Sequence, residues 1–208
     1  NYSGALTNNG ITSNSGDLTL NGAITGSGSF NNSKNVALNS DASKFSGTYT
    51  QTAGSTTVAS TGKVFGGEKN INGGSLNITS TEAIDYTNVK LGNNAQLNHT
   101  AQSADKNVVS DNVVKFTGSG ATANFGASAG VQGNYELTTK IDNGKANKVV
   151  FNNSTVNLTL QDYTGSTEYR LSNSDLNLVE KGEAAATKDY TFTNLTTDNA
   201  TLSFNVEI

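Results

Sequence analysis

The stretch Leu18-Thr-Leu-Asn-Gly-Ala-Ile-Thr-Gly-Ser-Gly-Ser-Phe30 opens with two leucines on either side of one threonine. Similar pairs begin at positions 36, 56, 76, 95, 114, 135, 156 and 176, so successive pairs lie 18 to 21 residues apart. Two such residues with one between them are typical of a β-strand with one buried face. Their near-constant spacing indicates a repeat architecture, in which each repeat contacts only its neighbours.

Strands one period apart would lie directly above one another, so we predict an all-β fold, a right-handed parallel β-helix. It would have about nine to ten coils of ~20 residues. At ~4.8 Å per coil the rod would be roughly 50 Å long. We predict that its interior ladder consists of Leu18, Leu20, Val36, Leu38, Val58, Leu76, Ile78, Leu97, Phe116, Leu137, Val156, Leu158, Leu176 and Leu178.

A β-sandwich of antiparallel hairpins is the alternative fold, because Asn-Gly pairs such as Asn21-Gly22 are also hairpin signals. The period is longer than the spacing of about 8–12 residues that is typical of sandwich strands, so the β-helix is preferred. A second apolar series, including Phe30, Tyr49, Phe125 and Phe151, lies about ten residues out of phase and predicts a further strand in each coil.

The pattern predicts one solenoid over residues 1–208, with less regular end coils at 1–15 and 179–208. Turns such as Asn72-Gly73-Gly74 and Gly118-Ser-Gly120 supply residues that accept a positive φ. Because the chain begins within the pattern at Asn1, we expect it to be a fragment of a longer protein.

The composition excludes several classes of function. Hydrophobic residues make up 34% of the chain and charged residues 14%, and there is no cysteine or proline. Without cysteine there is no disulfide framework, zinc–thiolate site or cysteine nucleophile. The net charge of −4 argues against nucleic-acid binding, which favours a basic face. No apolar run approaches the ~20 residues of a membrane-spanning helix, so we expect no membrane insertion.

Three further segments follow the first leucine pair in a recognisable order. Phe45-Ser-Gly-Thr-Tyr49 precedes Gly54-Ser-Thr-Thr-Val58, and Gly73-Gly-Ser-Leu-Asn-Ile78 repeats the last element. With the Leu18-Thr-Leu strand and its glycine-rich turn, these segments make residues 16–80 resemble the passenger-associated repeat of autotransporter proteins. The resemblance implies a right-handed parallel β-helix that is exposed on, or released from, a Gram-negative cell surface.

The strongest candidate for chemistry is acidic. Asp142, Asp162 and Glu183 are spaced 20 and 21 residues apart, close to one coil. Carboxylates stacked in this way could bind Ca²⁺ or act as the paired acids of a polysaccharide-cleaving enzyme, although all three lie near turns, where charges are ordinarily solvated. The single histidine, His99, has no second histidine or cysteine to complete a zinc or transition-metal site. We expect His99 to be a solvated strand or turn residue.

The tail alternates through Leu202, Phe204, Val206 and Ile208, which predicts a strand with an edge open to assembly. We expect a non-catalytic structural or adhesive rod segment of an extracellular bacterial surface or secreted protein, with no cofactor. Its partners would be a host or neighbouring-cell surface, a glycan or other copies of itself. The alternatives are a self-assembling filament or sheath subunit that uses this tail, and a polysaccharide-active enzyme on the same fold.

Overall fold

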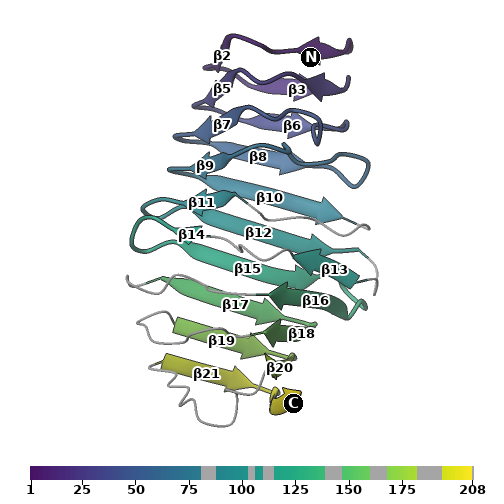
Figure 1. Ribbon diagram of the computed structural model, residues 1–208, viewed down its shortest axis with the longest axis vertical. Coiled ribbons are helices and arrows are strands. Elements are labelled where there is room, and N and C mark those ends of the chain that lie inside the picture. The colour runs from purple at the N-terminus through teal and green to yellow at the C-terminus, as the bar shows by residue number, and fades with distance from the viewer. Residues whose placement is uncertain are drawn as a thin grey trace.

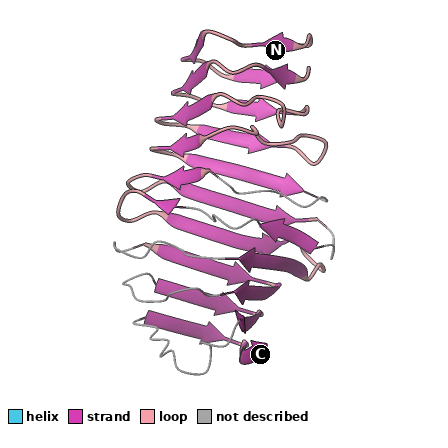
Figure 2. Cartoon of the chain, viewed as in Figure 1, coloured by secondary structure: helices cyan, strands magenta, loops and turns pink. Residues whose placement is uncertain are grey.

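The apolar pairs of the sequence form short strands that stack in parallel along one axis in the computed structural model (Figure 1). The structure describes residues 1–80, 88–102, 106–109, 115–138, 147–159, 168–181 and 194–207. Within these ranges the chain consists of strands joined by loops (Figure 2), and all strand pairs are parallel. Leu76 is the register partner of Leu97, so the predicted parallel β-solenoid is confirmed and the antiparallel sandwich is excluded.

One sheet runs the length of the molecule. Its nine strands, in order, are β3 (Leu18–Leu20), β6 (Val36–Leu38), β8 (Ser55–Val58), β10 (Ser75–Ser80), β12 (Gln96–Ala101), β15 (Thr122–Ala127), β17 (Lys148–Asn152), β19 (Glu168–Ser172) and β21 (Asn194–Asp198). We call it the long sheet. Because each of its strands belongs to a different coil, the long sheet joins all of these coils by backbone hydrogen bonds.

Two shorter sheets divide the remaining side of the solenoid between them. The N-terminal sheet contains β2 (Ile11–Asn14), β5 (Ser29–Asn32), β7 (Thr48–Gln51), β9 (Lys69–Ile71), β11 (Val89–Leu91) and β14 (Lys115–Phe116). The C-terminal sheet contains β13 (Lys106–Val109), β16 (Gly133–Thr138), β18 (Ser154–Thr159), β20 (Asp175–Lys181) and β22 (Thr201–Glu207). A small pair, β1 (Leu6–Thr7) and β4 (Ile24–Thr25), completes the N-terminal end.

The structure follows the predicted interior ladder as far as Ile78 and then departs from it. Leu97 lies above Leu76, two residues out of the predicted register. Phe116 belongs to the N-terminal sheet, where it pairs with Leu91. The later members, Leu137, Val156, Leu158, Leu176 and Leu178, lie in the C-terminal sheet. The single predicted column is therefore wrong beyond Leu97, and its residues are distributed over three sheets.

Two longer coils cause this departure. The partner of Leu97 in the next coil is Ala123, and the partner of Ala123 is Val149, so each of these steps is 26 residues. The strands of all three sheets alternate with the same period of two, so the sequence pattern alone cannot assign a strand to a sheet. Phe125 and Phe151, expected in a second series, occupy the long sheet instead.

The interior is filled by stacked side chains from the facing sheets. One column of the long sheet consists of Leu20, Leu38, Val58, Ile78, His99, Phe125, Phe151 and Leu171, all of which are buried. Aromatic rings fill the N-terminal half: Tyr49 stacks on Phe65 with ring centroids 4.3 Å apart, and Phe30 contacts both edge-on. The first coil is the least complete, since Ile11 is 79% exposed.

Buried polar side chains in this interior are paired with backbone carbonyls, which offsets the cost of removing them from water. Gln51 is fully buried, and its Nε2 donates to the carbonyl oxygens of Gly54, Gly73 and Ser75 at 3.1 to 3.2 Å. Lys69 is buried as well, and its Nζ donates to the carbonyl oxygens of Phe65 and Gly67 at 2.8 Å.

The corners of the coils differ between the two halves. In the N-terminal half the sharp corner precedes the long sheet, and positive φ values occur there at Gly54, Gly74, Asn94 and Gly120. In the C-terminal half the sharp corner follows the long sheet, and Asn153, Asn173 and Asn199 have φ values of 51°, 47° and 47°. Glycine and asparagine tolerate this left-handed conformation better than other residues. These residues therefore allow the chain to turn within one to three residues.

Asparagine side chains on the outer face of the long sheet bind one another from coil to coil. Asn98 Nδ2 donates to Asn77 Oδ1 at 2.8 Å, and Asn124 Nδ2 donates to Asn98 Oδ1 at 2.6 Å. The same contact joins Asn177 to Asn157 on the C-terminal sheet. These amide ladders reinforce the backbone ladders and use much of the outer hydrogen-bonding capacity. The described residues contain no helix long and apolar enough to cross a membrane.

Candidate functional site

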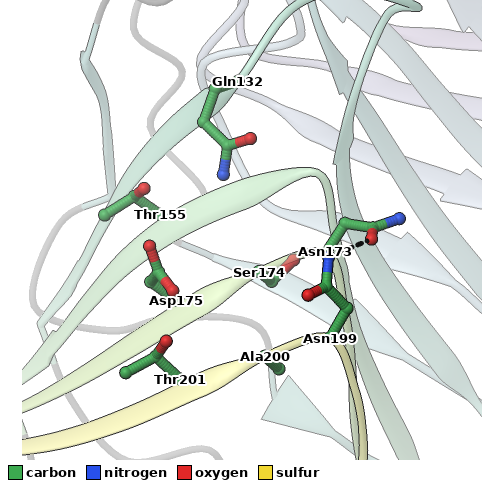
Figure 3. A pocket seen from close by; sticks show the side chains of 8 residues that line it. All are labelled: Gln132, Thr155, Asn173, Ser174, Asp175, Asn199, Ala200 and Thr201. Carbon is green, nitrogen blue, oxygen red and sulfur yellow. Dashed lines mark hydrogen bonds between the residues drawn. The ribbon is translucent and has the colours of Figure 1, made fainter.

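A polar groove lies at the corner between the long sheet and the C-terminal sheet, across β18, β20 and β22 (Figure 3). Its volume is about 440 Å³. The residues that line it are Gln132, Thr155, Asn173, Ser174, Asp175, Asn199, Ala200 and Thr201. We call it the corner groove. Its residues come from three successive coils, so the solenoid repeat itself brings them together.

The corner asparagines form one rim of the groove. Asn173 and Asn199 each turn the chain from the long sheet into the C-terminal sheet in a left-handed conformation. Asn199 Nδ2 donates to Asn173 Oδ1 at 2.9 Å, and the backbone N–H of Asn173 donates to the carbonyl of Asp198 at 2.9 Å. The two amides are therefore fixed one above the other on a rigid corner.

Small residues lie next to these asparagines in the sequence. Ser154 and Ser174 are buried, and Ala200 is half-buried. Ser174 Oγ donates to the carbonyl of Ser172 at 2.8 Å and accepts from the backbone N–H of Ser154 at 3.2 Å. These serines hold the corner together, and their small side chains leave space above them.

The opposite rim is a column of one residue from each coil. Thr155 is the register partner of Asp175, and Asp175 is the register partner of Thr201. Figure 3 shows these three side chains one above another, facing the two asparagines, with Gln132 above them. Neighbouring strands are ~4.8 Å apart, so the column presents a hydroxyl, a carboxylate and a hydroxyl at that interval.

The groove side chains differ from the asparagine ladders in their hydrogen bonding. Within the described part of the chain, no hydrogen bond or ion pair engages the side chains of Gln132, Thr155, Asp175 or Thr201. Amides and hydroxyls both donate and accept hydrogen bonds, whereas the ionised carboxylate only accepts them. The groove can therefore hydrogen-bond a polar ligand that carries donors and acceptors.

The predicted acidic column cannot be compared with this groove, because Asp142, Asp162 and Glu183 lie outside the described residues. The Ca²⁺ site expected there stays a prediction. Among the residues that are described, no group of three or more His, Asp or Glu side chains could hold a metal ion.

Sequence analysis did not single out the residues of the corner groove. A signal for them is present, since Asn153-Ser-Thr155, Asn173-Ser-Asp175 and Asn199-Ala-Thr201 repeat an asparagine, a small residue and a polar residue. Their spacing is 20 and then 26 residues. A search for one fixed period misses this motif because of the longer second step.

His99 lies inside the solenoid, which corrects the expectation that it is solvated. It is only 1% exposed and stands in the inward column between Ile78 and Phe125. Its ring meets Tyr135 edge-on, with centroids 5.3 Å apart. Burial disfavours the charged imidazolium and lowers the pKa of His99 to about 4. Tyr135 Oη donates to the carbonyl of Gly126 at 2.6 Å, and burial raises the Tyr135 pKa.

The predicted assembly strand forms β22, which pairs with β20 of the same chain along one edge. Leu202 is the register partner of Leu176 and packs against the core. The backbones of Phe204 and Val206 pair with those of Leu178 and Glu180, and Ile208 lies outside the described residues. A role of this strand in assembly stays a prediction.

Comparison with known proteins gives no relative from which a function could be transferred. No protein-family model matches the chain, and neither a curated protein nor a solved structure is significantly similar to it.

Proposed function

We propose that the chain is a non-catalytic structural segment of a bacterial cell-surface or secreted protein, in which it forms a rigid rod or stalk. The observation that carries the proposal is the continuity of the long sheet, whose nine strands connect successive coils in register. A side chain at one end of such a sheet is held at a fixed distance from a side chain at the other. This property suits a spacer that projects an attached domain away from a surface.

The interior and the outer ladders support the same role. The buried columns of apolar and aromatic residues resist bending because each coil packs on the next. The outer amide ladders add hydrogen bonds along the same axis. Only 14% of the residues are charged, so like-charge repulsion along the rod is small.

The surface location rests on the sequence resemblance. Residues 16–80 resemble the passenger-associated repeat, which implies exposure on, or release from, a Gram-negative surface. A rod in that position would meet host or neighbouring cells, and adhesive contacts would be made by its exposed corners and loops.

An antibody against the purified chain tests the location. We expect it to label intact, unpermeabilised cells that produce the full-length protein, or to detect the protein in their medium. External protease should remove the label from the cells, while a cytoplasmic marker in the same cells stays intact. Labelling that appears only after permeabilisation, with no protein in the medium, would contradict the proposal.

A further inference from the structure

We propose that the corner groove binds a neutral saccharide. The groove combines a concave surface of about 440 Å³ with polar side chains from three coils. The inference adds a ligand to the proposed surface rod, but it concerns the purified chain and does not depend on the location of the protein.

The first step is the contrast between two kinds of outer polar side chain. Asn77, Asn98 and Asn124 bind one another on an open sheet face, so much of their hydrogen-bonding capacity is already used. In the groove, Asp175 and Thr201 are exposed, and no side-chain hydrogen bond within the described part of the chain engages them. Here the donors and acceptors converge on a hollow, where a ligand could meet several of them at once.

The second step is the position of these groups. Thr155, Asp175 and Thr201 stand on β-strands, and Asn173 and Asn199 stand on corners that backbone hydrogen bonds fix. Groups on such rigid elements lose little conformational entropy when a ligand binds. The groove is therefore organised for binding before the ligand arrives.

The third step is the charge of the lining. Asp175 is its one ionisable side chain, which disfavours an anion. A single carboxylate is a poor site for Ca²⁺, which takes about 6–8 oxygen ligands, often with several carboxylates. Ala200 is the one apolar lining residue, so an apolar ligand would gain little.

A neutral saccharide fits the remaining chemistry. Its hydroxyl groups both donate and accept hydrogen bonds, as do the amides of Gln132, Asn173 and Asn199 and the hydroxyls of Thr155 and Thr201. Asp175 can accept hydrogen bonds from sugar hydroxyls, and bonds to a charged acceptor are stronger than neutral ones. Because the column continues along the axis at ~4.8 Å per coil, a short oligosaccharide could span more than one coil.

The test uses the whole purified chain on a printed panel of glucose, galactose, mannose and N-acetylglucosamine oligomers, alongside sialylated and sulfated glycans. The oligomer that binds best is then titrated against the wild type and the variants Asp175→Ala and Gln132→Ala. These residues approach the groove from β20 and from the segment before β16. Asp17→Ala is the matched control, because Asp17 is an exposed aspartate before β3, near the opposite end of the rod.

We expect a neutral oligomer to bind, and Asp175→Ala to weaken binding by about tenfold or more. Gln132→Ala should weaken it as well, and Asp17→Ala should leave it unchanged, with equal melting temperatures for all four proteins. Three results would overturn the proposal: no neutral oligomer binds, only acidic glycans bind, or the groove variants bind as well as the wild type. None of these results bears on the cell-surface labelling, so the two proposals can fail separately.

Discussion

At the scale of single residues, His99 should make the stability of the protein depend on pH. Its pKa is about 4 in the folded protein and about 6.5 in an unfolded chain, so the unfolded chain binds more protons between these values. Its surroundings are Ile78, Phe125 and the Tyr135 ring, and none of them carries a charge. The stabilisation is therefore complete above pH 6.5 and is lost as the pH falls towards 4. We expect the free energy of unfolding in urea to fall by about 2 kcal/mol between pH 7.5 and pH 5.

The variant His99→Phe is the control for this prediction, because Phe125 and Phe151 already occupy the same column. Since His99 is the single histidine of the chain, the variant should lose the pH dependence in this range. Three carboxyl groups also have lowered pKa values, through hydrogen bonds from Ser43 to Asp41, from Lys90 to Glu68 and from Arg170 to Glu168. Their contributions are lost mainly below pH 5, outside the measured range. Equal stability of the wild type at pH 7.5 and pH 5 would show that His99 is not held neutral.

The burial of His99 also shows where sequence reasoning fails for single residues. A histidine that follows Leu97 and Asn98 in a polar context is typical of a solvated strand. Its inward direction follows from register, since it lies two residues after an inward leucine and above Ile78. The exact strand register decides which face such a residue occupies, and a shift of one residue would reverse the answer.

At the scale of elements, the corners before the long sheet should depend on glycine. Gly74 has a φ of 71°, and a Cβ at this position would collide with the carbonyl oxygen of Gly54 in the coil above. Because both atoms belong to the backbone ladder, neither can move without breaking hydrogen bonds. We expect Gly74→Ala to lower the free energy of unfolding in urea by about 3 kcal/mol or more, from the strain of a left-handed alanine and from this collision.

Two other glycines separate these contributions. Gly130 has a φ of 77° with open space around its Cβ position, so Gly130→Ala should cost only about 1–2 kcal/mol of backbone strain. Gly16 has neither a positive φ nor a close neighbour, and Gly16→Ala should change stability by less than about 0.5 kcal/mol. If Gly74→Ala costs no more than Gly130→Ala, the coils are not packed as closely at this corner as the structure indicates.

The elements also show how much of the fold the sequence predicts. The strands near Leu18, Val36 and Leu76 were predicted in their correct register because their coils are 18 to 20 residues long and have similar turns. After Leu97 the coils lengthen and the strands of the C-terminal sheet replace those of the N-terminal sheet. An amphipathic strand such as Val156–Leu158 buries one face equally well in either sheet, so its sequence carries no mark of the exchange. The corner groove lies in the part after this exchange and could not be assembled from a fixed period.

At the scale of the whole molecule, a solenoid should tolerate the removal of one complete coil. Asn153-Ser154 and Asn173-Ser174 are identical pairs at equivalent corners, with φ values of 51° and 47° at the asparagines. Deletion of residues 154–173 therefore joins Asn153 to Ser174 in the same conformation and brings β17 beside β21. Because each coil contacts only its neighbours, the shortened chain should fold with a modest loss of stability.

Spin labels on one row of the long sheet measure the result. Thr57 and Thr196 are exposed, and register partners connect them through six strand spacings. The chain has no cysteine, so Thr57→Cys and Thr196→Cys provide unique labelling sites. At ~4.8 Å per spacing the backbone separation should shorten from about 29 Å to about 24 Å on deletion, as pulsed electron spin resonance can detect. Deletion of residues 154–163 alone places the corners out of register and should abolish the cooperative unfolding transition. A folded half-coil deletion, or an unchanged distance after the full deletion, would mean that the coils do not stack one above another along this row.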